Sequence, residues 1–432
     1  MALTIVIGAL SVFGMLALAL TEHKLHPRHA SWRIFWMAPL TGAMLLIALR
    51  VISLSDAIGG LLADSAVNPL KILVLFFAMT LMSVFLDEMG FFRFMAMAVL
   101  SRAGTNQRRL FLLLYAAVSV LTVFTSNDIV VLTFTPFICY FAKHAKIDPL
   151  PYLFCEFVAA NTWSMALVIG NPTNIYLATS AGVDFLSYLR VMLLPTLLAG
   201  GTSLLMLWLV FSRKLREPMI PSVGEERVKG KFSVGLALSS LGTCIFLMVI
   251  SSYISLPMWL IAAACCVFMY LSVISERVLR HRTLSPVGHS VLRAPFDVAP
   301  FVISMFLIVM GLSHVGVTDA LSRVLLGEGE ILRTGVASFL AANLVNNIPM
   351  SVLFSSVVAP AGEASIPALY AAVIGSNIGA FFTPMGALAG IMWLTLLRQH
   401  NVKLSFGKFM VYGAMISIPT LLTALLGLSI LL

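Results

Sequence analysis

Two clusters of amide and acidic residues interrupt stretches of this chain that are otherwise apolar enough to lie in lipid. The first is Ser-Asn-Asp-Ile at 126–129, and the second is Val-Asn-Asn-Ile-Pro at 345–349 in the other half of the chain. Hydrocarbon offers no water to amide or backbone groups, so such polar, helix-breaking sequence persists in a membrane only where it faces protein or a hydrated cavity. The clusters predict a membrane protein with a polar site between its helices.

The composition supports a polytopic, all-α membrane protein. Of 432 residues, 60% are hydrophobic and 10% are charged, and the mean hydropathy is +1.01, which leaves no polar shell for a soluble core. The net charge of +9 comes from basic residues in short loops, without the basic, aromatic-interleaved face of a nucleic-acid-binding protein. We expect a multi-pass protein of the cell inner (plasma) membrane that binds no nucleic acid.

The sequence offers little to an enzyme or to a resident metal. It contains no G-x-S-x-G or H-E-x-x-H motif, and its acids do not cluster. Five cysteines lie in apolar segments without a C-x-x-C spacing, so we interpret them as small core residues. Residues 1–20 lack a basic start and an A-x-A cleavage site, which favours a retained first span over a signal peptide. We expect no enzymatic activity and no cofactor beyond a coupling proton or sodium ion.

Apolar runs long enough to cross about 30 Å of hydrocarbon, with the charges between them, divide the chain into four sections. These are N-terminal transmembrane helices at 1–68, a first repeat at 69–211, a basic linker with a transmembrane helix pair at 212–295, and a second, inverted repeat at 296–432. Within them, residues 35–54 are expected to form the second span, and residues 91–100 an interfacial amphipathic segment.

Each repeat contains a candidate re-entrant hairpin with a polar tip. In the first, apolar runs at 110–125 and 129–142 flank the cluster, and basic residues stand at both outer ends, so both ends should be cytoplasmic. Two straight spans are the alternative, but they would place one basic end outside. The second hairpin, 340–358, is broken at 346–349 and opens onto 361–363, which has no lysine or arginine, so it should enter from outside.

The same charge bias predicts the orientation of the chain in the membrane. Lys143, Lys231 and Arg282 belong to basic loops and should be cytoplasmic. Glu363 and Leu432 should then face the outside.

Two further helices carry internal breaks, at 170–174 (Gly-Asn-Pro-Thr-Asn) and at 383–384 (Thr-Pro), where glycine and proline remove helical hydrogen bonds. Four matches occur in the same order in both halves of the chain. They pair 86–90 (LDEMG) with 312–316 (LSHVG), Asn127 with Asn346, Asn161 with Asn377, and 195–198 (PTLL) with 419–422 (PTLL). Because the loop charges orient the copies oppositely, the pattern is typical of inverted-repeat secondary transporters, whose site lies at the midplane.

Several of these motifs resemble the arsenite efflux permeases. They are 374–379 (IGSNIG) with 383–389 (TPMGALA) and Trp393, the tip residues Asn127-Asp128 and 346–349 (NNIP), and 86–92 (LDEMGFF). The resemblance extends from Leu70 to the C-terminus. It implies membership of the ion transporter superfamily, which also holds sodium-coupled dicarboxylate and citrate carriers and sodium/proton antiporters, and it implies two hairpins and two broken helices. The dicarboxylate branch carries Ser-Asn-Thr at both tips, and the 170–174 break departs from the bacterial arsenite permeases.

The candidate substrate-binding residues are amides and hydroxyls at the breaks, because opposed hairpin tips expose backbone groups and helix N-termini. They are Asn127, Asn161, Asn174, Asn346, Asn347, Ser376, Asn377 and Thr383. An alternative is that the asparagines only hold helices together through interhelical hydrogen bonds.

Ion coupling is assigned to Ser126, Asp128 and Glu156, because a carboxylate buried in lipid must be paired with a cation or protonated. Asp128 as a cap of the second hairpin arm, and Glu156 in a structural pairing, are the alternatives. Asp87 and Glu88 end the third span near the interface, where acids cost little, so a structural role is expected for them.

No lysine or arginine stands at the breaks, and a multiply charged anion would need one. We therefore expect efflux of arsenite or antimonite as the neutral hydroxide by proton antiport. A sodium- or proton-coupled anion carrier of the dicarboxylate or citrate type, or a sodium/proton antiporter, is the alternative. Partners are a small inorganic or anionic solute and the lipid bilayer; the resemblance leaves open a homodimer and a cytoplasmic ATPase subunit. An ion channel fits poorly, because two closed hairpins suit alternating access.

Overall fold

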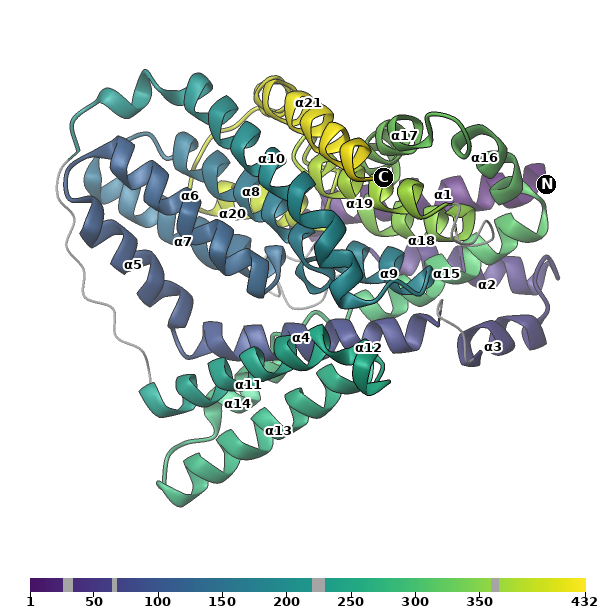
Figure 1. The fold of residues 1–432 in the computed structure, drawn as a ribbon, viewed down its shortest axis with the longest axis horizontal. Coiled ribbons are helices and arrows are strands. Elements are labelled where there is room, and N and C mark those ends of the chain that lie inside the picture. The colour runs from purple at the N-terminus through teal and green to yellow at the C-terminus, as the bar shows by residue number, and fades with distance from the viewer. Residues whose placement is uncertain (26–33, 64–67, 220–229, 359–364) are drawn as a thin grey trace.

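The computed structural model describes residues 1–25, 34–63, 68–219, 230–358 and 365–432, and these residues form helices without any strand (Figure 1). Seven of the described helices are long and apolar enough to cross a membrane, and several shorter apolar helices accompany them. The predicted all-α, polytopic architecture is confirmed.

The N-terminal helices are α1 (Ala2–Leu25), α2 (Met37–Ala48) and α3 (Leu54–Leu62). We expected one span at 35–54. The observed helix is shorter, because α2 ends at Ala48 and α3 begins as a separate helix. Arg50 adopts a positive φ of 56° between them, and Ser53 accepts a hydrogen bond from the backbone N–H of Asp56 at 3.0 Å. This N-cap starts a new helix and divides the apolar run.

Two sets of seven helices follow the same order in the two halves. The first set is α4 (Pro69–Glu88), α5 (Phe91–Ala103), α6 (Gln107–Phe124), α7 (Asn127–Ala145), α8 (Leu150–Trp163), α9 (Pro172–Ser180) and α10 (Phe185–Phe211). The second is α15 (Val298–His314), α16 (Val317–Leu325), α17 (Glu330–Val345), α18 (Asn347–Val358), α19 (Ile366–Gly379), α20 (Leu388–Gln399) and α21 (Phe406–Leu431). The helix after α4 and the helix after α15 both start at a glycine with positive φ, 80° at Gly90 and 78° at Gly316. The matched sequences therefore fold alike.

Helices α6 and α7 form the first hairpin, and its two outer ends lie at the same end of the molecule. Gln107, at the start of α6, accepts a hydrogen bond from Tyr152 on α8 (2.7 Å) and donates one to the Glu217 carbonyl (2.9 Å). Asp148, just after α7, pairs with Lys214 beyond α10. The hairpin therefore returns to the end where it began, as predicted.

Helices α17 and α18 form the second hairpin, and both of its outer ends lie beside α16. Thr334 near the start of α17 donates a hydrogen bond to the Leu325 carbonyl at 3.4 Å. At the other arm, Ser322 on α16 donates to the Val357 carbonyl near the end of α18 at 2.5 Å. The loop that follows, with Glu363, lies outside the described residues.

Both predicted helix breaks are present. Between α8 and α9 the chain makes two short 3-10 helices, η1 (Ser164–Ala166) and η2 (Val168–Gly170), and a loop of eight residues separates α19 from α20. A Cβ at Gly170 would lie 2.2 Å from the Ser164 carbonyl oxygen, and one at Gly386 would lie 2.4 Å from the Gly379 carbonyl oxygen. Only glycine allows the chain to fold back this closely at the two breaks.

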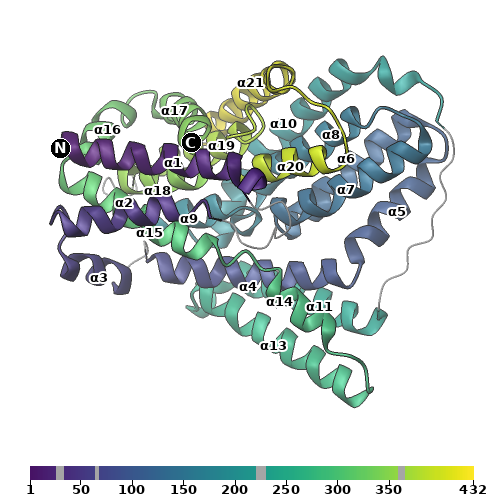
Figure 2. The same ribbon diagram turned by 180° about the vertical axis from the view of Figure 1, so that it is seen from behind.

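The linker helices are α11 (Lys231–Val249), α12 (Ser251–Ile254), α13 (Met258–Leu279) and α14 (Ser285–Leu292). α11, α13 and α14 pack along α4, on the side of the molecule away from α10 and α21 (Figures 1 and 2). A Cβ at Gly230, just before α11, would lie 3.4 Å from the Arg282 guanidinium. Lys231 and Arg282 therefore share one end of the molecule, as the orientation predicted from the loop charges requires.

The two long helices α10 and α21 cross each other and join the halves. At the crossing, a Cβ at Gly427 would lie 3.3 Å from the Cα of Pro195. Each helix contains a proline followed by a threonine, and Thr196 and Thr420 each donate a hydrogen bond to the carbonyl four residues earlier at 2.6 Å. Threonine back-bonding beside a proline is one way a membrane helix re-satisfies freed carbonyls.

Candidate functional site

A cavity of about 400 Å³ lies where the two hairpin tips meet. The α7 tip contributes Ser126 and Asp128, and the α18 tip contributes Asn347 and Ile348. The break before α9 adds Asn171 to the wall. Segments from both halves of the chain thus enclose one polar space.

Four half-helices begin at this cavity, because the first residues of α7, α9, α18 and α20, or their immediate neighbours, line it. The first N–H groups of a helix have no partner within that helix, and the helix dipole places partial positive charge there. The N-termini of α7 and α20 can therefore offer hydrogen-bond donors to an oxygen-rich solute. At α9 and α18, Pro172 and Pro349 have no N–H, and the N–H groups of Thr173 and Asn347 already donate within the protein.

A hydrogen bond between two side chains joins the first hairpin tip to α8. Asn127 donates from Nδ2 to Oδ1 of Asn161 on α8 at 3.1 Å, and both residues are buried. Asn161 in turn donates to the Phe157 carbonyl at 2.8 Å, which fixes its orientation. Oδ1 of Asn127 is buried and accepts no hydrogen bond from the described part of the chain. This tip therefore keeps one acceptor for a further donor.

Asn377 on α19 joins the two halves of the molecule. Its Oδ1 accepts hydrogen bonds from Ser164 (2.9 Å) and from Asn171 Nδ2 (3.0 Å), and its Nδ2 donates to Asn174 Oδ1 at 2.7 Å. Asn174 also donates to the Ser164 carbonyl at 2.8 Å. All four side chains are buried, so the network fixes the α8–α9 break against α19.

The second hairpin tip is held mainly by backbone groups. Asn346 has φ 76° and ψ 154°, a region that favours glycine, and its Nδ2 donates to the Met385 carbonyl at 3.1 Å. The backbone N–H of Asn347 donates to the Gly386 carbonyl at 3.1 Å. The tip is therefore tied to the α19–α20 break along the main chain.

Asn343 was not predicted from sequence, although it completes this connection. Its Oδ1 accepts two hydrogen bonds from Thr383, from the hydroxyl at 2.7 Å and from the backbone N–H at 3.0 Å. Its Nδ2 donates to the Phe339 and Gly379 carbonyls at 2.8 and 3.0 Å. The hydroxyl of Thr383, a predicted substrate ligand, therefore points to Asn343. One turn separates Asn343 from Asn346, and this helical spacing was the available signal.

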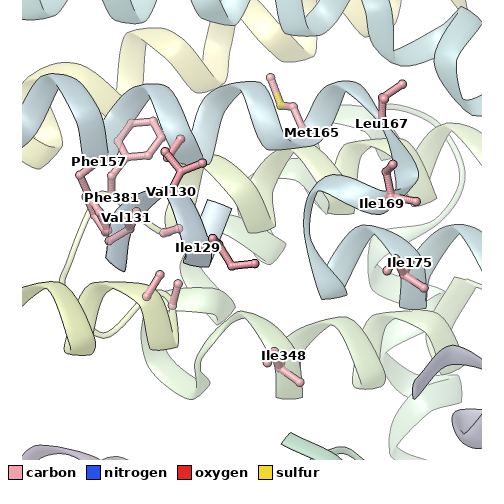
Figure 3. Close-up of a cluster of buried hydrophobic side chains, with 14 of the residues drawn as sticks. Ile129, Val130, Val131, Phe157, Met165, Leu167, Ile169, Ile175, Ile348 and Phe381 are labelled. Carbon is pink, nitrogen blue, oxygen red and sulfur yellow. The ribbon is translucent and has the colours of Figure 1, made fainter. Parts of the chain in front are cut away.

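Apolar side chains surround the tips. Figure 3 shows Ile129 from α7 and Ile348 from α18, with Met165, Leu167 and Ile169 from the segment between α8 and α9. All five are buried. Such surroundings exclude water and strengthen the hydrogen bonds beside them.

Acids dominate the charge of the cavity wall. Among the described residues that line it, Asp87, Asp128 and Asp297 are acidic and Arg293 alone is basic. Arg293 reaches the wall from the loop before α15, whereas the breaks themselves carry no lysine or arginine, as noted from the sequence. The guanidinium binds the carboxylates of Asp87 and Glu88, and although partial burial acts against it, these neighbours raise the pKa of Arg293. The charge of this arginine is already paired within the protein.

The remaining candidates lie away from the cavity wall. Glu156 is fully buried on α8, where its two carboxylate oxygens lie 3.3 Å from the Thr135 hydroxyl of α7. Ser376 on α19 is buried, and its hydroxyl has no hydrogen-bond partner among the described residues. Cys155, also buried, faces the Phe111 carbonyl at 3.6 Å. Of the predicted ion-coupling residues, only Ser126 and Asp128 reach the cavity.

Residues 10–432 match the model of a protein family described as "Arsenical pump membrane protein". A protein of that name from Escherichia coli is 29% identical over 427 residues, which covers 92% of this chain and 93% of the relative. The "46 kDa membrane protein" of Mycobacterium leprae is 25% identical over 411 residues, covering 90% and 92%. The crystal structure of the Alcanivorax borkumensis YdaH transporter aligns with a TM-score of 0.54 at 15% identity, covering 92% of this chain and 95% of that one, which indicates a shared fold.

Proposed function

We propose that this chain, which belongs to the family of arsenical pump membrane proteins, exports trivalent arsenic or antimony as the neutral hydroxide in exchange for a proton. The family match and the fold establish a multi-pass membrane transporter. The solute and the coupling ion are the parts that we propose, and the chemistry of the cavity between the tips supports them.

The observation that carries the proposal is the charge of the cavity wall. Of the described residues that line the cavity, three are acids and one is an arginine, which is itself paired with Asp87 and Glu88. A di- or tricarboxylate would meet repulsion from these acids, because the arginine among the described lining residues is already paired. A neutral hydroxide avoids the repulsion.

The polar groups near the tips suit a solute with several hydroxyl groups. Such a solute both donates and accepts hydrogen bonds, so it can use the helix N-termini as donors and amide or carboxylate oxygens as acceptors. Asn347 and Asn171 reach the cavity directly, while Asn127, Asn161 and Asn377 hold the tip and the break in place behind it. The proposal therefore gives the amides two roles, contact and support.

Asp128 is the coupling group of the proposed cycle. It stands on the cavity wall in the first turn of α7, next to the tip that must move if access alternates. A carboxylate held within the membrane is costly unless a proton or cation neutralises it. Proton binding and solute binding would thus alternate, which links the proton gradient to export.

Everted membrane vesicles test the proposal. Uptake of radiolabelled arsenite should require a proton gradient, acidic inside, and should collapse with a protonophore while a sodium gradient has no effect. If arsenite uptake requires a sodium gradient instead, the coupling ion is sodium rather than a proton. Uptake of citrate or a dicarboxylate without any arsenite uptake would replace the solute with the alternative anion carrier.

A further inference from the structure

The carboxylate of Asp87 connects the first hairpin to α4 at the edge of the cavity. Asp87 is 3% exposed in the last turn of α4 and lines the cavity. Its Oδ1 accepts a hydrogen bond from the Thr133 hydroxyl of α7 at 2.8 Å. Its Oδ2 accepts one from Nη2 of Arg293 at 2.6 Å. Both oxygens are therefore engaged, each by a different part of the structure.

Arg293 fixes this carboxylate from the opposite side. Its Nη1 donates to Glu88 at 2.9 Å, so the guanidinium spans two successive acids of α4. The Nδ1 atom of His289, on α14, lies 3.6 Å from Glu88. The Arg293 side chain is 47% exposed on the loop between α14 and α15, whereas Asp87 is buried. α4 and α14 also pack on each other, so Arg293 and its acids belong to one rigid group.

The second repeat lacks an equivalent connection. The residue that matches Asp87 is Ser313, and the residue six positions beyond the second tip asparagine, which matches Thr133, is Val352. The Ser313 hydroxyl accepts a hydrogen bond from Thr318 of the neighbouring α16 at 3.1 Å, not from the hairpin. Among the described residues at these matched positions, a hydrogen bond from a hydroxyl to a carboxylate therefore joins the hairpin to the flanking helix in the first half and not in the second.

We propose that Thr133, Asp87 and Arg293 form a latch that holds the first hairpin against α4 in the conformation seen here, with Arg293 as the residue that positions Asp87. In this conformation the cavity runs from the tips to the last turn of α4, the end of the molecule with Lys231 and Arg282. Alternating access requires the hairpin to move relative to α4, so the Thr133–Asp87 bond must break once per cycle. The latch rests on the alternating access of the proposed function, but not on the identity of the solute.

The energetic scale suits a contact that is made and broken. Hydrogen bonds between helices in membranes are weak enough to change a two-state ratio by about threefold to tenfold. Arg293 neutralises Asp87 and orients it, which keeps a buried carboxylate from being left uncompensated when the hairpin leaves.

Labelling of the cavity from either membrane face tests the latch without any solute. Ser126→Cys provides the probe, and a membrane-impermeant maleimide is applied to everted or right-side-out vesicles. Thr133→Val keeps the side-chain shape and removes the hydroxyl, so labelling from the outer face should rise about threefold to tenfold, while cytoplasmic labelling stays equal or falls. Thr122→Val is the matched control, because that buried hydroxyl on α6 has no partner among the described residues.

Arg293 is tested in the same assay. Arg293→Gln should produce the same shift in labelling as Thr133→Val. Arg293→Lys should shift labelling less, because lysine retains the positive charge. Combining Thr133→Val with Arg293→Gln should add little, since both changes act through one carboxylate. Unchanged labelling in Thr133→Val, or additive effects in the double variant, would overturn the latch. If the variants shift labelling as expected but the unmodified protein does not transport arsenite, the proposed solute is wrong and the latch is still supported.

Discussion

The two hairpin tips occupy matched positions but are held in different ways. The first tip bonds to a side chain, from Asn127 to Asn161, and has an acid, Asp128, in the following position. At the second tip, Asn346 and Asn347 bond to main-chain groups of the α19–α20 break, and Asn343 adds further bonds. The repeats share a fold, yet their polar contacts have diverged.

This difference suggests a division of work between the halves. A tip that bonds through side chains and carries a titratable group can respond to an ion, whereas a tip fixed along its backbone provides a rigid wall. The following predictions test that division, beginning with the variant that should change transport most.

Asp128→Asn should reduce gradient-driven accumulation of arsenite to the level of vesicles without the protein. The amide keeps the shape of the side chain but cannot gain or lose a charge, so it loses the change that links ion to solute. Exchange of arsenite at equal concentrations should persist, since that step need not release the ion. The measurement compares net uptake with counterflow in the same vesicles.

Glu156→Gln is the matched control, because Glu156 is buried away from the cavity wall. Its effect should be milder than that of Asp128→Asn. If Asp128→Asn still concentrates arsenite while Glu156→Gln cannot, the coupling role belongs to Glu156.

Asn377→Ala should lower transport roughly tenfold to hundredfold, because it removes the bonds to Ser164 and Asn174 and the acceptor that the described residues provide to the buried Asn171 Nδ2, at about 1–3 kcal/mol for a buried group that loses its partner. Ser417→Ala, which removes a buried hydroxyl with no partner among the described residues, should have little effect. Initial uptake rates at equal membrane expression provide the comparison. Equal rates for both variants would show that the network does not support transport.

Asn346→Ala should destabilise the protein more than Asn346→Gly, by about 1–3 kcal/mol, because alanine tolerates a φ of 76° poorly whereas glycine accepts it. Thermal unfolding in detergent measures the difference, and both variants lose the bond to Met385. Asn127→Ala should change the melting temperature less than Asn346→Ala, since Asn127 has no positive φ and its change removes only the side-chain bond to Asn161. The reverse order would contradict the proposed difference between the tips.

Single cysteines at Lys143, Lys231 and Arg282 should react from the cytoplasmic face and leave transport unchanged. A cysteine at Leu432 should react from the outside. An impermeant maleimide applied to intact cells and to everted vesicles distinguishes the faces. Cytoplasmic labelling at position 432 would show that the two halves are not inverted relative to each other. The comparison of their tips would then lose its basis.

Much of the fold could be predicted because the membrane constrains sequence directly. The predicted end of the first repeat at 211 coincides with the end of α10, and both breaks and both tips occur at the glycines, prolines and amides that marked them. α17 begins at Glu330, earlier than the expected 340, because its first turns carry charges that an apolar count excludes. α16 was missed for the same reason, since it is amphipathic and only nine residues long.

The site was harder to predict, because its polar contacts depend on tertiary structure. The sequence identified Asn161 and Asn377 as candidates. It did not show that Asn161 bonds to the hairpin tip of its own half, or that Asn377 bonds to the helix break of the other half. Arg293 was assigned to a cytoplasmic loop by its charge, and Asp87 to the interface by its position. Only the folding of the loop before α15 against α4 brings them to the cavity.

The crossing of α10 and α21 has a consequence for the order in which the chain assembles. Gly427, near the C-terminus, packs against Pro195 of the first half. Every helix between α10 and α21 is synthesised before this contact can form, so α10 must first reside in the bilayer with lipid or other helices in place of α21. Long-range contacts of this kind form late. The packing of α10 is therefore completed only once α21 has been made, and loss of the final turns of α21 would leave α10 without this contact.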